Sequence, residues 1–230
     1  MRLMIRVLIS MLAASSVACA VFSAPSRSQS QTPMSQVATP DGRKSLVVAG
    51  GCFWCLEVLF EDLKGVQFGE SCYVGGSRAG VTYQEVCSGT TGHAEAIRVV
   101  FDPKVIAADD LLRIFFTIHD PTTLNRQGPD SGTQYRSAIF YADEEEKARA
   151  ERIRKEIADE KIWQNPLVTT VEPLVNYTRA EEYHQDYYAR YEKASPEERA
   201  KMNAGYCSAI IQPKVLKFRQ KFAHLLKKSG

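Results

Sequence analysis

The sequence predicts one folded domain in which β-strands and α-helices are mixed. Its 230 residues, of which 44% are hydrophobic, are enough for a single domain with a sizeable core. Residues 94–101 alternate with the two-residue period of a strand, whereas the apolar residues that follow Gly51 recur at helical spacing. Elements of both kinds are therefore expected.

Glycine, proline and acidic residues mark the ends of the predicted elements. Glycines follow the first helix and the second strand, acidic residues begin the two middle helices, and prolines lie at the start of the last two. A polar loop at 121–133 is long enough for a binding role. We expect strands at 45–49, 66–73, 94–101, 135–141 and 167–172, and helices at about 52–63, 109–118, 143–161, 180–187, 196–202 and 215–228.

Cys52 lies where an apolar strand ends and a helix begins. The first-turn N–H groups of a helix lack partners and carry partial positive charge, which favours a thiolate over a thiol. The effect is worth only ~0.3–1 kcal/mol, and one pKa unit corresponds to ~1.36 kcal/mol, so another group must help to drive any chemistry. Three interpretations remain open for residues 52–55: a redox C-x-x-C pair, a buried structural cysteine, and a nucleophile in an aromatic pocket.

Glu95 shares a strand face with apolar residues. The alternation of residues 94–101 places it on the same face as Ile97, Val99 and Phe101. A carboxyl group there either has a partner or keeps its proton, because desolvation raises the pKa of a glutamic acid. The position of Glu95 by itself is equally consistent with two roles. It could be an acid in a site, or a carboxylate hydrogen-bonded to nearby serines and threonines.

The N-terminal residues have the pattern of an export signal. Two arginines precede an apolar stretch, 7–17, that is too short to span a bilayer, and Ala-Cys-Ala at 18–20 fits a cleavage site. We therefore expect a signal peptide at 1–20, a flexible linker rich in Ser, Gln, Thr and Pro at 21–42, and the folded domain at 43–230.

Export determines how the cysteines are interpreted. The expected location is the periplasm of a Gram-negative bacterium, with a lipid attached at Cys19 as the alternative. An oxidising compartment allows disulfides, yet a domain of this size does not need them, so an unpaired thiol is a candidate reactive group. After cleavage an odd number of cysteines remains, namely Cys52, Cys55, Cys72, Cys87 and Cys207.

Composition and spacing exclude several classes of function. Twenty-nine basic and 27 acidic residues are well mixed, and no recognition motif for a nucleic acid is present. The cysteines and histidines lack the paired spacing of metal ligands. We expect no membrane span in the mature chain, no nucleic-acid partner, and a monomer.

Four motifs resemble those of the A-type peptide methionine sulfoxide reductases, in the same order. They are Gly-Cys-Phe-Trp at 51–54, Gly-Thr-Thr-Gly-His-Ala-Glu at 89–95, Gly-Thr-Gln-Tyr-Arg-Ser at 132–137 and Tyr-His-Gln-Asp-Tyr at 183–187. The resemblance implies an α+β fold with a ferredoxin-like core, a mixed β-sheet flanked by helices, and long loops. It also implies reduction of the S epimer of methionine sulfoxide, in proteins and free, without a metal or organic cofactor.

The resemblance implies roles for individual residues. A sulfoxide sulfur is a poor electrophile until its oxygen is protonated or strongly hydrogen-bonded, so the site needs a neutral acid as well as a nucleophile. By position, the nucleophile is Cys52, the acid is Glu95, the hydroxyl donors are Tyr83 and Tyr135, the walls around the substrate methyl group are Phe53 and Trp54, and further pocket residues are Asp130 and Tyr206.

The sulfenic acid formed at Cys52 would condense with a second thiol to a disulfide. Cys207 resembles the resolving position of the family and lies in a late segment that can swing in, while Cys55 is the alternative. No cysteine follows Cys207, so the relay of three cysteines found in some relatives is excluded. A thioredoxin-like protein outside the cytoplasm, or a dithiol, would then reduce the disulfide.

Other functions fit parts of the sequence. A thioredoxin-type thiol–disulfide oxidoreductase would use Cys52 and Cys55, and an exported binding module would hold a methionine side chain without turnover. A cysteine protease fits less well, because no base is paired with Cys52. We expect His93 and His184 to belong to the hydrogen-bonding framework and Cys87 to pack within the fold.

Overall fold

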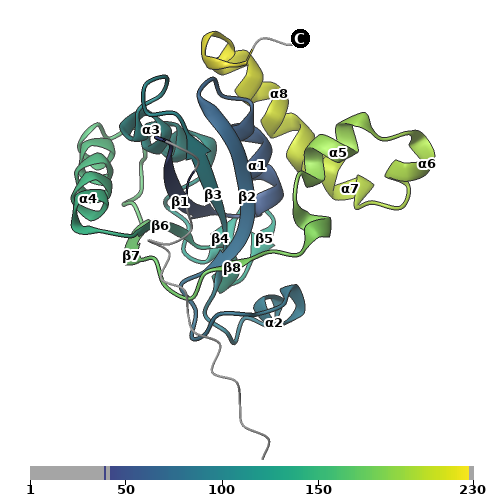
Figure 1. Ribbon diagram of the computed structural model, residues 1–230, viewed down its shortest axis with the longest axis horizontal. Coiled ribbons are helices and arrows are strands. Elements are labelled where there is room, and N and C mark those ends of the chain that lie inside the picture. Colours follow the sequence, from purple (N-terminus) through teal and green to yellow (C-terminus); the bar gives the residue numbers. More distant parts are fainter. Residues whose placement is uncertain (1–38, 40–41, 228–230) are drawn as a thin grey trace, which may run out of the picture. The chain divides into compact units, whose positions relative to one another are not determined.

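The computed structural model describes residue 39 and residues 42–227 (Figure 1). The predicted signal peptide, almost all of the predicted linker and Cys19 lie outside these residues. Within them, six strands form a sheet in the order β7-β6-β1-β3-β2-β8, and β4 and β5 form a separate hairpin. The strands are β1 (Lys44–Gly50), β2 (Val66–Val74), β3 (Ala94–Phe101), β4 (Arg126–Gln127), β5 (Asp130–Ser131), β6 (Ser137–Tyr141), β7 (Thr170–Pro173) and β8 (Thr178–Arg179).

The helices are placed between and after these strands. The α-helices are α1 (Phe53–Glu61), α2 (Tyr83–Cys87), α3 (Ala108–Ile118), α4 (Glu144–Asp159), α5 (Tyr187–Lys193), α6 (Pro196–Arg199), α7 (Ala204–Tyr206) and α8 (Gln212–Lys221). The 3-10 turns are η2 (Thr133–Tyr135), η3 (Glu182–His184) and η5 (Ala223–Leu225), and η4 (Cys207–Ile211) is a π-helical turn.

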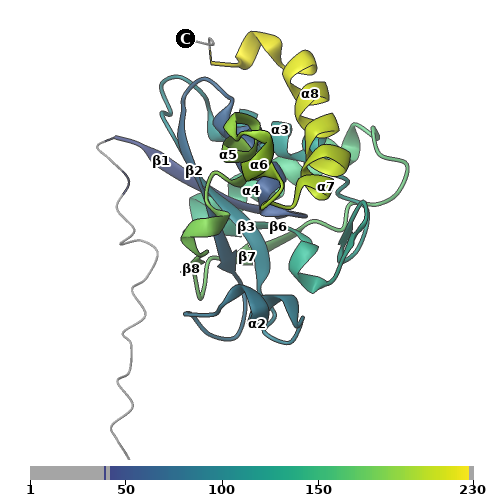
Figure 2. The ribbon, with the colours of Figure 1, turned by 90° about the vertical axis from the view of Figure 1, so that its right-hand side faces the viewer.

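The topology confirms the predicted fold class. The succession β1-α1-β2-β3-α3-β6 with the spatial order β6-β1-β3-β2 is the ferredoxin-like arrangement. These four strands pair in antiparallel fashion, whereas β7 adds to β6 in parallel, so the sheet is mixed. Figure 2 shows the same sheet after a turn of 90°.

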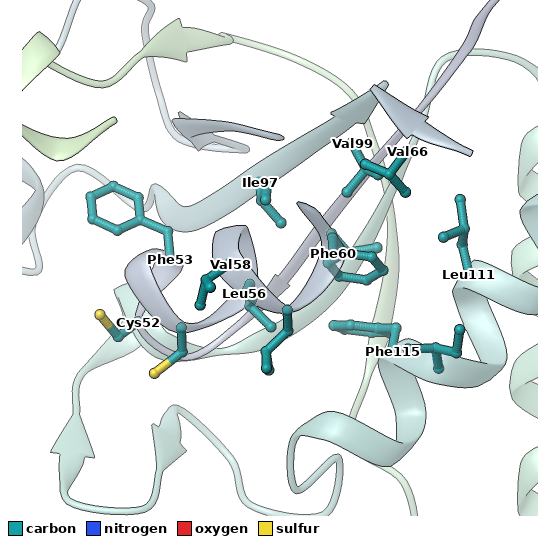
Figure 3. Close-up of a cluster of buried hydrophobic side chains, with 14 of the residues drawn as sticks. Cys52, Phe53, Leu56, Val58, Phe60, Val66, Ile97, Val99, Leu111 and Phe115 are labelled. Atoms are coloured by element: carbon teal, nitrogen blue, oxygen red, sulfur yellow. The ribbon is translucent and has the colours of Figure 1, made fainter. Parts of the chain in front are cut away.

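The two faces of the sheet are covered by different kinds of structure. One face packs against α1, α3 and α4, and α8 packs against α1; together they form the larger apolar cluster. The other is covered by the segment between β7 and β8 through Leu174 and Tyr177. Because both faces are covered, all eight residues of β3 are buried. Figure 3 shows Cys52 and Phe53 at one end of the larger cluster and Phe115 towards the other, so the thiol lies at the margin of the core.

Several predicted elements differ from those observed. The strand predicted at 135–141 begins only at Ser137. Tyr135 belongs to the 3-10 turn η2, which precedes the strand. The helix predicted at 180–187 is wrong: Asp186 adopts a left-handed conformation (φ 52°), which separates η3 from α5. The polar connection at 82–89 contains helix α2, which starts with a capping box formed by Thr82 and Glu85.

The long polar loop predicted at 121–133 carries the β4–β5 hairpin and supports the start of α1. Gly51 has φ +95°, and a Cβ atom there would lie 2.5 Å from Cγ of Gln127. Glycine is therefore required, because a side chain would be strained by the backbone and would collide with the hairpin. This close approach fixes the backbone that leads into Cys52.

Candidate active site

A pocket of about 170 Å³ lies at the N-terminal end of α1. It is bounded by β3, the start of α1, the start of α2, the hairpin strand β5, the turn η2 and helix α7. Eight of the nine residues predicted for the site line it, and Cys207 does not. The lining residues are Cys52, Phe53, Trp54, Tyr83, Glu95, Asp130, Tyr135, Asn203 and Tyr206.

A larger cavity lies elsewhere in the described part of the chain. It measures about 460 Å³ and is bounded by the start of β1, by α3 and by α4. Its lining contains no cysteine or histidine and none of the predicted site residues. The smaller pocket therefore is the one that contains a thiol together with the predicted acid.

Cys52 occupies the N-cap position of α1 and is 8% exposed. Burial raises its pKa well above the ordinary value, and the neighbouring Cys55 raises it further, while the Tyr206 hydroxyl and the Trp54 backbone N–H oppose the shift. The sequence indicated that the helix N-terminus alone could shift the pKa of Cys52 only slightly towards the thiolate. Desolvation outweighs the helix end, so the resting group is a thiol.

Glu95 lies beside Cys52 and is 2% exposed. Its Oε2 accepts a hydrogen bond of 3.3 Å from the backbone N–H of Phe53, rather than from a serine or threonine. Burial raises the pKa of Glu95 well above the ordinary value, and the closeness of Cys52 raises it further. Both effects favour the protonated carboxylic acid, which can give up a proton next to a thiol.

Trp54 forms an apolar wall that two other segments hold in place. Its indole stacks on the ring of Tyr187 with centroids 3.7 Å apart and planes 7° apart. The indole Nε1–H donates to Nδ1 of His184 at 3.1 Å, so the His184 proton lies on Nε2. Burial lowers the pKa of His184 to about 4, which keeps the imidazole neutral. His184 thus supports the pocket directly through Trp54.

Hydroxyl groups surround the polar side of the pocket. The Tyr206 hydroxyl donates to Oδ2 of Asp130 at 2.6 Å. Burial is the main cause of raised pKa values at Tyr83 and Tyr135, which therefore remain phenols able to donate hydrogen bonds. Glu181 fixes the start of α2, since its carboxylate accepts the Tyr83 backbone N–H at 2.8 Å.

The five cysteines in the described residues are all free thiols. Cys207 is completely buried at the start of η4, in the same apolar cluster as Cys52 and Cys55. Burial is the main cause that raises the pKa of Cys207, to about 11. Cys87 is exposed, so the expectation that it packs within the fold is wrong. In the short helix α2 only Val86 is buried, and the side of the helix that carries Cys87 is exposed to solvent.

Residues 42–227 contain no group of three or more His, Cys, Asp or Glu side chains placed to hold a metal ion. No helix in this part of the chain is both long enough and apolar enough to cross a membrane.

A sequence model of the family described as peptide methionine sulfoxide reductase matches residues 44–225. The chain belongs to this family. The match spans all of the pocket residues and confirms the resemblance of the four motifs. The peptide methionine sulfoxide reductases are oxidoreductases, and the chain is accordingly an enzyme of that class.

Individual reductases show the same similarity. The peptide methionine sulfoxide reductase MsrA of Deinococcus radiodurans is 45% identical over 201 residues, which cover 87% of this chain and 93% of that protein. The crystal structure of Mxr1 from Saccharomyces cerevisiae in reduced form has a TM-score of 0.63 and 36% identity, covering 68% of this chain and 90% of that chain. Methionine sulfoxide reductase A of Corynebacterium diphtheriae also has a TM-score of 0.63, with 33% identity over 68% of this chain and 78% of that chain.

Sequence reasoning assigned no role to three residues that shape this reductase pocket. Tyr187, which stacks on Trp54, is the last residue of the fourth motif, so its presence in the motif was a signal. Asn203 lines the pocket and caps α7 by accepting the Tyr206 N–H at 3.3 Å, a role for which asparagine is favoured. Glu181 accepts hydrogen bonds from the Tyr83 N–H and the Tyr73 hydroxyl, contacts distant in sequence that no local pattern reports.

Glu57 lies on α1 and is 2% exposed, and neither of its carboxyl oxygens has a hydrogen-bond partner among the described residues. It is faced by the Ser71 hydroxyl of β2, by Glu61 of its own helix, and by the backbone amide and carboxyl group of Asp186. Burial, the largest cause, raises its pKa from 4.5 to about 8. Glu57 is therefore protonated at neutral pH.

Replacing Glu57 by glutamine is expected to remove a pH dependence of stability. Because the folded pKa lies above the unfolded one, the contribution of Glu57 is complete below about pH 4.5 and is lost as the pH rises towards 8. The wild-type free energy of unfolding should fall relative to Glu57→Gln by about 1.4 kcal/mol per pH unit across this range. Urea unfolding from pH 5 to pH 9 measures this difference, with the exposed Glu160→Gln as control. Parallel curves for Glu57→Gln and wild type would contradict a buried, protonated Glu57.

Proposed function

We propose that this chain reduces the S epimer of methionine sulfoxide, in proteins and as the free amino acid, through a sulfenic acid at Cys52. The observation that carries the proposal is the meeting of a thiol and a neutral carboxyl group in one pocket. The Phe53 N–H, which directly follows Cys52, holds the Glu95 carboxyl group at 3.3 Å. The acid and the nucleophile are thereby kept together.

The chemistry follows from these protonation states. Glu95 gives its proton to the sulfoxide oxygen, which makes the substrate sulfur electrophilic. The Cys52 sulfur attacks that sulfur, and the thiol proton passes to the Glu95 carboxylate. The oxygen is transferred to Cys52 as its bond to the substrate breaks, leaving methionine and a Cys52 sulfenic acid. The hydroxyls of Tyr83 and Tyr135 stabilise the charge that develops on the oxygen.

The selectivity for one epimer comes from three different surfaces around the substrate sulfur. Phe53 and Trp54 offer an apolar wall to the methyl group, Glu95 faces the oxygen, and Cys52 approaches the sulfur. A chiral sulfoxide can satisfy all three in one configuration only. The opposite epimer would place its oxygen against the aromatic wall or its methyl group against the acid.

Regeneration uses thiols and requires no metal or organic cofactor. The oxidised Cys52 forms an intramolecular disulfide with Cys207, which belongs to the same buried apolar cluster. A thioredoxin-like protein, or a dithiol in vitro, then returns both residues to thiols. Asp130 and Tyr206 complete the pocket through their mutual hydrogen bond.

The proposed cellular location is based on the N-terminal sequence. Residues 1–20 have the charge and apolar pattern of a signal peptide, 21–42 the composition of a linker, and 43–230 form the reductase domain. Export would direct the enzyme to the periplasm of a Gram-negative bacterium, where it would repair oxidised exported proteins as a monomer. Cell fractionation and the N-terminal sequence of the mature protein test this placement.

The function is tested by chiral chromatography of racemic N-acetyl methionine sulfoxide incubated with residues 43–230 and dithiothreitol. We expect the S epimer to disappear and the R epimer to persist. Cys52→Ser serves as the blank and should consume neither epimer. Consumption of the R epimer, or of neither epimer by the wild type, would refute the proposal.

A further inference from the structure

We propose that Glu57 is a positioning residue of the reductase pocket: its carboxyl group secures residues 184–187 (the support segment) against α1 and so fixes the Trp54 ring. This role rests on the proposed function, because Trp54 is there the wall for the substrate methyl group. Glu57 itself does not line the pocket. It therefore acts on the reaction through Trp54.

Trp54 and Glu57 meet the support segment from the same side of α1. They lie three residues apart, and residues at this spacing are neighbours on the surface of a helix. Trp54 contacts the segment through its hydrogen bond to His184 and its stacking on Tyr187. Glu57 faces Asp186, which lies between these two residues in the chain. The segment is thus held against α1 at two adjacent points, and a displacement at one is transmitted to the other.

Strand β2 closes the third side of this junction. The Gln185 side chain is bound to the backbone of Ser71: its Oε1 accepts the Ser71 N–H and its Nε2 donates to the Ser71 carbonyl, both at 3.0 Å. The Ser71 hydroxyl faces Glu57 and has no hydrogen-bond partner among the described residues. The Glu57 carboxyl group is therefore enclosed by α1, β2 and the support segment, where water cannot hydrate a charge.

The charge state of Glu57 determines how firmly the junction is held. Burial raises the pKa of Glu57 to about 8, and the charges of Glu61, on its own helix, and Asp186, at the start of α5, add to the shift. As a neutral acid, Glu57 fills the junction without repulsion. As a carboxylate it would repel the exposed Asp186 side chain, which lies at the break between η3 and α5 and can move into solvent with the support segment. The Trp54 ring would then lose its fixed position.

Substrate binding and the protonation of Glu57 are therefore coupled. The acid form keeps the wall in place, so the affinity for the sulfoxide falls as the pH rises through about 8. Linkage requires a reverse effect of equal size: bound substrate raises the pKa of Glu57 and draws a proton onto it. A carboxyl group that only stabilised the fold would show neither effect.

The first test measures binding without chemistry. Isothermal titration calorimetry follows N-acetyl methionine S-sulfoxide binding to Cys52→Ser, which cannot react, and to Cys52→Ser/Glu57→Gln from pH 6 to pH 9. In Cys52→Ser we expect Kd to be at least about threefold higher at pH 9 than at pH 6, since coupling between two sites is typically at least about fivefold. The Glu57→Gln protein should lack this rise, while the exposed Glu160→Gln, in the same background, should keep it. The same rise in all three proteins would overturn the positioning role.

The second test keeps Glu57 in place and measures the proton that binding draws in. Calorimetry of Cys52→Ser at pH 8, in two buffers of different ionisation enthalpy, gives the number of protons taken up for each sulfoxide bound. We expect about 0.3 proton more than in the Glu57→Gln protein, as a fivefold coupling at the midpoint of the titration requires. Any contribution from Glu95 is present in both proteins and cancels. Equal uptake would overturn the positioning role, whereas the chiral assay of the wild type decides the proposed function separately.

Discussion

Replacing Glu95 by glutamine is expected to slow the formation of the Cys52 sulfenic acid by about 10²–10⁴-fold, the usual contribution of a positioned general acid. Glutamine preserves the shape of the side chain, and its oxygen can still accept the Phe53 N–H. Its amide can donate a hydrogen bond to the sulfoxide oxygen but cannot transfer a proton. The loss should therefore fall on the chemical step and spare the fold.

Single-turnover kinetics with rapid quenching measures this step without interference from regeneration. The wild-type rate should decrease as the pH rises through the raised pKa of Glu95, because the acid form is then lost. The Glu95→Gln rate should lack that decrease. Alkylation of Cys52 provides a structural control: burial and Cys55 raise the pKa of Cys52, and neither changes in the variant, so Cys52 should react with iodoacetamide at the wild-type rate. An unchanged single-turnover rate would exclude Glu95 from the reaction.

Replacing Trp54 by alanine is expected to lower kcat/KM for the S epimer by roughly 10–100-fold, since a large apolar side chain contributes about 1.5–3 kcal/mol when buried. The substrate methyl group would lose its apolar contact with the indole. Tyr187 would lose its stacking partner, and His184 would lose its hydrogen-bond donor. Trp54→Phe keeps an aromatic surface but removes the hydrogen bond to His184, so its loss should be smaller.

Steady-state kinetics on N-acetyl methionine S-sulfoxide separates these effects. A higher KM would indicate lost substrate binding, and a lower kcat would indicate a disordered reaction geometry. Trp163→Ala is the matched control, because Trp163 lines a different cavity, formed by the end of α4 and residues 163–167 of the following loop. If Trp54→Ala lost no more activity than Trp163→Ala, the indole would have no place in substrate binding.

The parts of the site that the sequence predicted depend on local periodicity. The two-residue alternation of 94–101 correctly placed Glu95 with Ile97 on the face of the larger apolar cluster. The glycine pair and the helical spacing after it correctly placed Cys52 at the start of α1. Backbone geometry at a single element fixes both positions, so a short stretch of sequence contains the necessary information.

The remaining features depend on contacts between distant segments. The Tyr73 hydroxyl donates to Glu181 across 108 residues, and Trp54 reaches His184 across 130. No local pattern reports such pairs. The resting protonation of Cys52 was also inaccessible, because it depends on how completely the surrounding loops exclude water. The broken helix at Asp186 had a local signal in retrospect, since aspartate tolerates left-handed backbone better than most residues.

The stacking of Trp54 on Tyr187 has an optical consequence. The chain contains two tryptophans, and Trp163 lies outside the pocket. A Trp163→Phe protein would carry a single indole fluorophore, located beside Cys52 and held by the segment that contains His184 and Tyr187. Sulfur oxidation next to the indole, or displacement of that segment, would change the emission. The enzyme thus contains its own spectroscopic probe, by which each redox state can be followed in real time without an added label.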